Sequence, residues 1–164
     1  MIILGIDPGY ATVGFGVIES FGGNKMPPLE YGVVTTPKED SLPKRLKQIA
    51  DSFAYLIEKY KPDAVAIEEL FFQNNQKTAI AVAEARGAIL LTVYEKCGKL
   101  YEYTPLQIKQ ALTGYGRAEK QQIQYMVKVL LKLEKIPKPD DAADALAVAI
   151  THAQISKMAG YFGI

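Results

Sequence analysis

The chain has 164 residues, enough to bury a hydrophobic core and few enough for one domain. Its hydrophobic content of 49% and charged content of 23% are those of an ordinary globular protein. The sequence has no apolar run of membrane-spanning length and no basic, signal-like N-terminus, so we expect no membrane partner. A single Cys97 excludes an intrachain disulfide and a cysteine metal cage, which favours a cytoplasmic location.

Apolar periodicity and turn residues predict the secondary structure in chain order. Strands are expected at residues 2–7, 12–19, 29–36, 64–68 and 100–103. Helices are expected at residues 42–60, 78–96, 105–112, 118–133 and 141–157. Three antiparallel strands followed by alternating helices and strands indicate an α/β fold with a mixed five-stranded sheet flanked by helices. We expect one domain over residues 1–158 and a short C-terminal tail over residues 159–164.

Four carboxylates lie within or directly after apolar runs that are otherwise expected to be buried: Asp7, Glu68, Asp141 and Asp144. An ionised carboxylate costs several kcal/mol to bury unless another group compensates its charge. If the first strand is central and the fourth lies beside it, Asp7 and Glu68 end at one sheet edge, and the last helix can bring both aspartates there. Oxygen-rich clusters of this kind hold hard divalent ions such as Mg²⁺.

Taken alone, most of these acids have a simple structural explanation. Asp7 can begin a turn, Glu68 beside Glu69 can be solvent-exposed, and Asp141 lies at a helix start, where the helix dipole favours acids. Asp144 is harder to explain, because it shares a helix face with Asp141 and like charges at this spacing repel. A bound cation removes that repulsion, so the four acids together favour a metal site.

The basic residues are concentrated in one part of the chain. Residues 107–138 contain seven basic and two acidic residues, although the formal net charge of the whole chain is +1. A basic flank beside an acidic cluster suits a polyanionic substrate that is cut at a metal site. From charge alone, solvated helix faces are the simpler explanation.

Four motifs occur in a fixed order: Gly5-Ile6-Asp7-Pro8-Gly9, Ala66-Ile67-Glu68, Gly114-Tyr115-Gly116-Arg117-Ala118-Glu119-Lys120 and Asp141-Ala142-Ala143-Asp144-Ala145-Leu146-Ala147. In this order the set resembles the signatures of the RuvC family of bacterial Holliday-junction resolvases, over nearly the whole chain. The resemblance implies an RNase H-like fold. It also implies an endonuclease that resolves four-way DNA junctions in recombination and repair by two symmetric nicks, leaving 5′-phosphate and 3′-hydroxyl ends.

The resemblance also implies the roles of particular residues. The metal-binding and catalytic acids correspond to Asp7, Glu68, Asp141 and Asp144, which would hold two Mg²⁺ ions, with Mn²⁺ as a substitute. Strand parity favours Glu68 over Glu69, because Glu68 shares a strand face with Ala64 and Ala66. The expected DNA contacts are Phe71, Lys109, Arg117 and Lys120.

Simpler explanations exist for the DNA contacts: the basic residues can be ordinary surface residues, and one of Phe71 and Phe72, more plausibly Phe72, can belong to the core. His152 is expected to be a core residue without a functional role.

Two symmetric nicks require two active sites, so we expect a homodimer. In the helix at residues 78–96, Ala79, Ala83 and Gly87 recur every four residues, which lets a second helix approach closely. Packing of this helix on its own sheet explains the pattern equally well, and the family resemblance favours the dimer. It further implies RuvA and RuvB, the branch-migration proteins, as partners.

Three other functions are compatible with parts of the sequence. Residues 5–9 also resemble the phosphate loop of actin-like ATPases and sugar kinases, but those proteins need two such domains. A non-catalytic nucleic-acid-binding module explains the basic stretch but not the acids. An RNase H-like nuclease that cuts RNA or RNA–DNA hybrids shares the chemistry and differs only in substrate.

Overall fold

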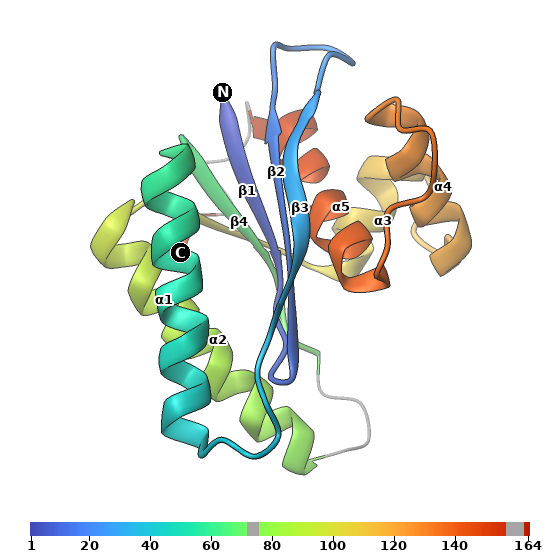
Figure 1. Ribbon diagram of the computed structural model, residues 1–164. Helices are drawn as coiled ribbons and strands as arrows, with labels where there is room; N and C mark the ends of the chain where they lie inside the picture. The colour runs from blue at the N-terminus through green and yellow to red at the C-terminus, as the bar shows by residue number, and fades with distance from the viewer. Residues whose placement is uncertain (72–75, 157–162) are drawn as a thin grey trace.

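A five-stranded sheet with helices on both faces forms the protein in the computed structural model, which describes residues 1–71, 76–156 and 163–164 (Figure 1). The strands are β1 (Ile2–Asp7), β2 (Thr12–Glu19), β3 (Pro28–Thr35), β4 (Ala64–Glu68) and β5 (Leu100–Tyr103). The helices are α1 (Leu42–Tyr60), α2 (Gln76–Lys96), α3 (Pro105–Thr113), α4 (Lys120–Leu130) and α5 (Asp140–Ile155). In the described part of the chain, no helix is long and apolar enough to cross a membrane.

The sheet has the strand order β3-β2-β1-β4-β5, so the predicted central position of β1 is confirmed. β1 is antiparallel to β2 and parallel to β4, and Ile6 is paired with Ile67 across the parallel ladder. Asp7 and Glu68 are the next residues along these two neighbouring strands. Parallel strands end at the same sheet edge, so both carboxylates lie there, as predicted.

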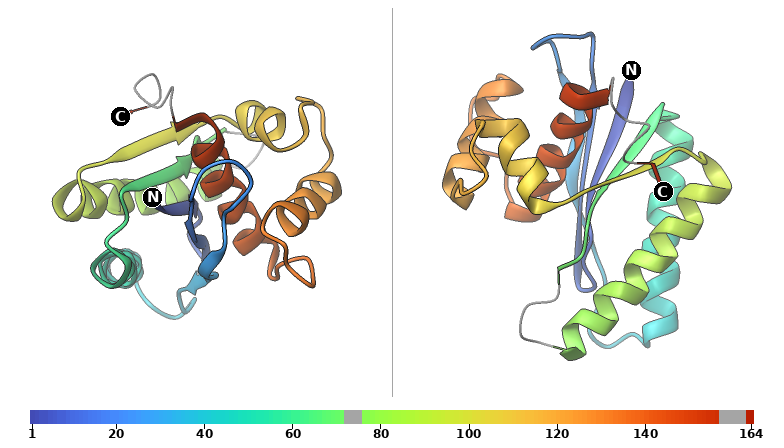
Figure 2. Two further views of the ribbon diagram at one scale, coloured as in Figure 1. Left: turned by 90° about the horizontal axis from the view of Figure 1, so that it is seen from above. Right: turned by 180° about the vertical axis from the view of Figure 1, so that it is seen from behind.

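The sheet separates two hydrophobic clusters. On one face α5 lies against the sheet with α3 and α4 outside it, and on the other face lie α1 and α2 (Figure 2). β4 contributes to both clusters by alternation: Ala66 packs toward α5, whereas Val65 and Ile67 pack toward α1 and α2. Glu68 therefore shares the α5 face with Ala66, as strand parity predicted.

α5 lies directly on β1 because a strand glycine leaves room for the helix backbone. A methyl group on Gly5 would lie 2.1 Å from the carbonyl oxygen of Ala145, a distance that real side chains do not tolerate. Glycine inside a strand often marks such a close backbone approach. This contact fixes the height of α5 above the sheet, and with it the position of the acids in its first turn.

Several predicted boundaries were wrong by a few residues. α4 is shorter than the predicted helix at residues 118–133. Glu119 caps its start by exchanging hydrogen bonds with Gln122, and Lys132, just beyond its end, has a φ of 54°, which does not continue a right-handed helix.

In the predicted tail, Gly163 forms a bridge with Tyr101 of β5, so the last two residues join the sheet edge.

Candidate metal centre

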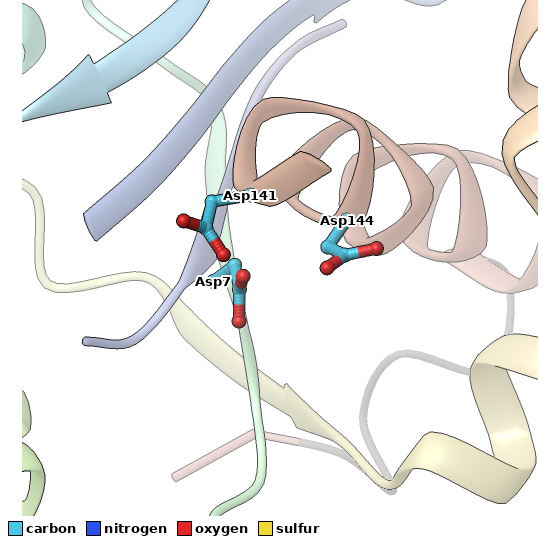
Figure 3. Close-up of side chains that lie close together, drawn as sticks. All are labelled: Asp7, Asp141 and Asp144. Carbon is cyan, nitrogen blue, oxygen red and sulfur yellow. The ribbon is translucent and has the colours of Figure 1, made fainter. Parts of the chain in front are cut away.

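Three aspartates converge at the edge of the sheet where β1 ends. Asp7 is the last residue of β1, and Asp141 and Asp144 lie in the first turns of α5, one helical turn apart (Figure 3). One carboxylate oxygen from each lies within 4.8 Å of the others, and all three residues are partly buried. The structure therefore brings three of the four predicted acids together.

Glu68 lies next to this cluster at the end of β4. It lines a pocket of about 290 Å³ together with Asp144, Lys109 and Lys120. Hydrogen bonding between the side chains of Glu68 and Asp7 is among the influences on the pKa of Glu68. Glu68 thus lies beside the three aspartates, and its charge, like those of Asp141 and Asp144, acts on Asp7.

The carboxylates raise one another's pKa values. Burial, followed by the charges of Glu68, Asp144 and Asp141, raises the pKa of Asp7 to about 9. Burial and the charge of Asp144 raise the pKa of Glu68 to about 6, and burial also raises the pKa of Asp144. Without a cation, the carboxylates of the site resist full ionisation. A divalent ion would offset both the free-energy cost of burying their charges and the repulsion between them.

The donor set fits a hard divalent ion. The cluster offers carboxylate oxygens and contains neither histidine nor cysteine, the ligands that zinc and copper prefer. Oxygen-only ligation by a few carboxylates, with space left for water and phosphate oxygens, is typical of Mg²⁺ sites in enzymes that act on phosphates.

Glu69, the competing glutamate, faces a different part of the molecule. Its backbone N–H donates to Tyr103 of β5, and its charge acts on Arg86 of α2. Arg86 itself forms an ion pair with Glu102 of β5. The charges that raise the pKa of Asp7 include Glu68 but not Glu69, so the local electrostatics favour Glu68 as the fourth acid.

Lys120 extends into the acidic cluster from the start of α4. Its Nζ lies 3.4 Å from Asp144 Oδ2 and 3.7 Å from Asp140 Oδ2. Burial lowers the pKa of Lys120, but the charge of Asp144 and the hydrogen bond to it outweigh this effect and raise it, so the side chain stays cationic. Lys109 of α3 lines the same pocket, whereas Arg117 is exposed in the turn before α4.

The aromatic residues after β4 are described only in part. Phe71 has 62% of its surface exposed, which excludes a core position for it. Phe72, the alternative core residue, lies outside the described residues. His152 is buried as expected, and its Nδ1 is hydrogen-bonded to the hydroxyl of Tyr103 at 2.7 Å.

The sequence analysis did not predict two features of the site. Asp140, the acid before Asp141, pairs with both Lys120 and Lys138 and so flanks the cluster. Gly14 of β2 packs against the backbone of Asp141. The spacing of glycines in the first two strands could have indicated this second feature, because glycine in a strand often marks a close backbone approach.

Comparison with known proteins covers the whole chain. The family model described as crossover junction endodeoxyribonuclease RuvC matches residues 3–152. A protein of that name from Petrotoga mobilis is 58% identical, with 98% of this chain and 100% of the relative covered. Another from Alkaliphilus oremlandii is 54% identical, with 100% and 99% covered.

The solved structure of Thermus thermophilus RuvC in complex with Holliday junction substrate superposes with a TM-score of 0.94 at 37% identity. The match covers 100% of this chain and 99% of that one. The predicted RNase H-like fold is therefore confirmed, and the chain belongs to the RuvC family of crossover junction endodeoxyribonucleases.

Proposed function

We propose that this protein is a metal-dependent endodeoxyribonuclease that resolves four-way DNA junctions in recombination and repair. The observation that carries the proposal is the cluster of Asp7, Asp141 and Asp144 within 4.8 Å, beside a pocket lined by Lys109 and Lys120. Carboxylates alone repel phosphate, and a cluster of this kind becomes useful to a nuclease once cations neutralise it. Full-length similarity to RuvC proteins, one of them solved with junction DNA, supports the choice of substrate.

The metal is proposed to be Mg²⁺, with two ions held by Asp7, Glu68, Asp141 and Asp144 and with Mn²⁺ as a substitute. When bound, such ions supply activation of a water molecule and neutralisation of charge on the leaving 3′-oxygen. Asp7 would help to hold these ions, because its carboxylate lies within 4.8 Å of those of Asp141 and Asp144 and its pKa responds to the charge of Glu68. The expected products carry a 5′-phosphate and a 3′-hydroxyl.

Lys109, Arg117, Lys120 and Phe71 are the proposed DNA contacts. The proposed role of Lys120 is to neutralise charge that develops on the scissile phosphate, and its contact with Asp144 in the acidic cluster supports this role. Arg117 is exposed outside the pocket and suits a phosphate farther along the strand. The exposed ring of Phe71, three residues after Glu68, can stack on a base that is unpaired at the junction centre.

Symmetric nicking calls for two copies of the site, and α2 offers the surface to pair them. Ile80, Leu91 and Tyr94 have 60%, 59% and 77% of their surfaces exposed. Together with Gly87, where an added methyl group would meet no atom within 4 Å, they lie on one helix face. We therefore propose a two-fold dimer through α2.

Family resemblance alone supports the remaining assignments. RuvA and RuvB are the proposed partners, and the proposed location is the cytoplasm, where bacterial DNA is recombined. Co-purification of the three proteins on junction DNA is the direct check of the partners.

The test uses one protein preparation on three substrates of matched sequence: a four-way junction, a linear duplex and an RNA–DNA hybrid. With Mg²⁺, we expect paired nicks at symmetric positions of the junction, ligatable products and little cutting of the other two. With Ca²⁺ in place of Mg²⁺, we expect binding without cleavage. Equal or faster cutting of the hybrid would instead support an RNase H-like activity on RNA.

A further inference from the structure

Arg45 is a buried cation that forms no ion pair with a carboxylate in the described part of the chain. It lies in the first turn of α1, and only 6% of its surface is exposed. Both burial and the positive end of the helix dipole disfavour a cation there. Among the described residues no ion pair includes Arg45, and Asp40, the acid whose pKa responds to it, is bonded to Lys44 and Gln48 instead.

The contacts of Arg45 lead to the turn that follows Asp7. Its guanidinium carbon lies 3.7 Å from the centre of the Tyr10 ring, and its Nε donates a hydrogen bond of 2.8 Å to Thr36 Oγ1. The hydroxyl of Thr36 in turn donates to the carbonyl oxygen of Tyr10 at 3.0 Å, and the Thr36 N–H donates to Ala11. Both contacts of Arg45 therefore hold the β1–β2 turn.

This turn has little freedom to absorb a displacement. Pro8 restricts the backbone directly after Asp7, and a methyl group on Gly9 would lie 1.9 Å from the carbonyl oxygen of Thr12. On the opposite face of the sheet, Gly14 packs against Asp141 of α5. The end of the hairpin is thus fixed between α5, which carries two acids of the cluster, and α1, which carries Arg45.

We propose that Arg45 is a positioning residue for the metal site: through Thr36 and Tyr10 it fixes the turn after Asp7 and thereby the direction of the Asp7 carboxylate. The proposal rests on the proposed function in that it takes Asp7 as a metal ligand. Residues that orient metal ligands from behind typically change metal affinity or activity 10–100-fold when they are replaced.

The matched pair Thr36→Val and Thr36→Ser separates the hydrogen bonds from the volume of the side chain. Calorimetric titration of Mn²⁺ into the metal-free, DNA-free protein measures the site directly, without relying on cleavage. We expect Thr36→Val to weaken Mn²⁺ binding about tenfold and Thr36→Ser to restore it. Arg45→Lys keeps the charge but loses the Nε donor, and we expect a loss similar to that of Thr36→Val.

Tyr60→Phe is the control for general destabilisation. It removes the contact between Tyr60 and Glu30, which also joins α1 to β3 but lies at the far end of the helix. We expect this variant to melt at a lower temperature and to bind Mn²⁺ as the wild type does. Wild-type Mn²⁺ affinity in folded Thr36→Val, or an equal loss in Tyr60→Phe at matched stability, would overturn the proposal.

Asp7→Asn distinguishes failure of this inference from failure of the proposed function. If Asp7→Asn binds Mn²⁺ like the wild type, Asp7 is not a ligand and both proposals fail. If Asp7→Asn loses Mn²⁺ binding while Thr36→Val and Arg45→Lys retain it, the metal site stands and only the role of Arg45 is rejected.

Discussion

Gly14 of β2 and Asp141 of α5 are in direct backbone contact. The approach is so close that a methyl group on Gly14 would lie 2.0 Å from the carbonyl oxygen of Asp141. Gly14 is also paired with Asp7 across the β1–β2 ladder. One small residue therefore sets the separation between two acids that are far apart in sequence.

Gly14→Ala should consequently displace the start of α5 and weaken the site. We expect Mn²⁺ affinity and Mg²⁺-dependent cleavage to fall at least about tenfold, measured at a temperature well below unfolding. The control is Gly32→Ala on β3, where the added methyl would lie 3.3 Å from the Phe15 ring, away from the acids. Equal activity in the two variants would show that this contact does not set the metal site.

Removing single carboxylates should stop the chemistry while DNA binding survives. Asp7→Asn, Glu68→Gln and Asp144→Asn are each expected to abolish Mg²⁺-dependent cleavage of a four-way junction, because each loses a charged oxygen ligand. Junction affinity, measured by gel shift in Ca²⁺, should stay near the wild-type value.

Glu69→Gln is the matched control, because Glu69 faces Arg86 and not the cluster. This variant should cleave junctions almost normally. If Glu69→Gln abolishes cleavage and Glu68→Gln does not, the assignment of the fourth acid is wrong.

The cluster should make the metal-free protein less stable as the pH rises. Burial and neighbouring acids raise the pKa of Asp7 from 3.8 to about 9, so the folded protein binds this proton more tightly than the unfolded chain does. Stability is then lost as the pH rises from about 4 to about 9, because the unfolded chain releases the proton first.

Asp7→Asn removes this penalty. At pH 8 without metal, we expect Asp7→Asn to melt at a higher temperature than the wild type, by a difference that shrinks toward pH 4. Added Mg²⁺ should raise the melting temperature of the wild type and leave that of the variant almost unchanged. A lower melting temperature for Asp7→Asn at pH 8 would contradict this account of the site.

Lys120 should matter more for the reaction than for binding. Because its Nζ lies 3.4 Å from Asp144, Lys120→Ala is expected to slow single-turnover cleavage much more than it weakens junction affinity. Lys128→Ala, on the same helix but outside the pocket, is the comparison. Lys120→Ala can instead lower junction affinity and leave the cleavage rate unchanged, while the slope of the logarithm of the binding constant against the logarithm of the salt concentration falls by about one. In that case Lys120 is an ordinary phosphate contact.

The exposed face of α2 should hold the dimer together. Leu91→Glu or Ala83→Arg places a charge on or beside this face, so we expect monomers by sedimentation and nicking without symmetric resolution. Tyr55→Glu is the control: Tyr55 on α1 is 61% exposed, much as Leu91 is, but lies on another helix. A wild type that stays monomeric on junction DNA, or dimeric Leu91→Glu, would reject α2 as the interface.

The sequence predicts most of the elements, the strand order and the convergence of Asp7, Asp141 and Asp144, because each depends on a local pattern or on motif order. The catalytic roles of the acids stay a prediction. Alternation in residues 64–68 placed Glu68 on the α5 face, and the structure agrees. The predicted start of α4 was wrong by two residues. The hydrogen bonds that Glu119 and Gln122 exchange at the helix N-terminus outweigh the spacing of apolar residues on which the prediction was based.

The contacts around Arg45 could not be predicted in the same way. Tyr10, Thr36 and Arg45 meet only after β3 has paired with β2 and α1 has turned back over the sheet, and none of the three has a distinctive sequence context. The position of Gly14 against Asp141 likewise depends on a helix that begins more than a hundred residues later in the chain.

The packing of α5 on β1 also determines when activity can arise during synthesis. Asp7 is synthesised well before Asp141 and Asp144, which follow only after five strands and four helices. Until then the nascent chain has two of the four acids and lacks the helix that covers one face of its central strand. A partly made chain is therefore expected to have no nuclease activity and to need protection of that apolar face against aggregation.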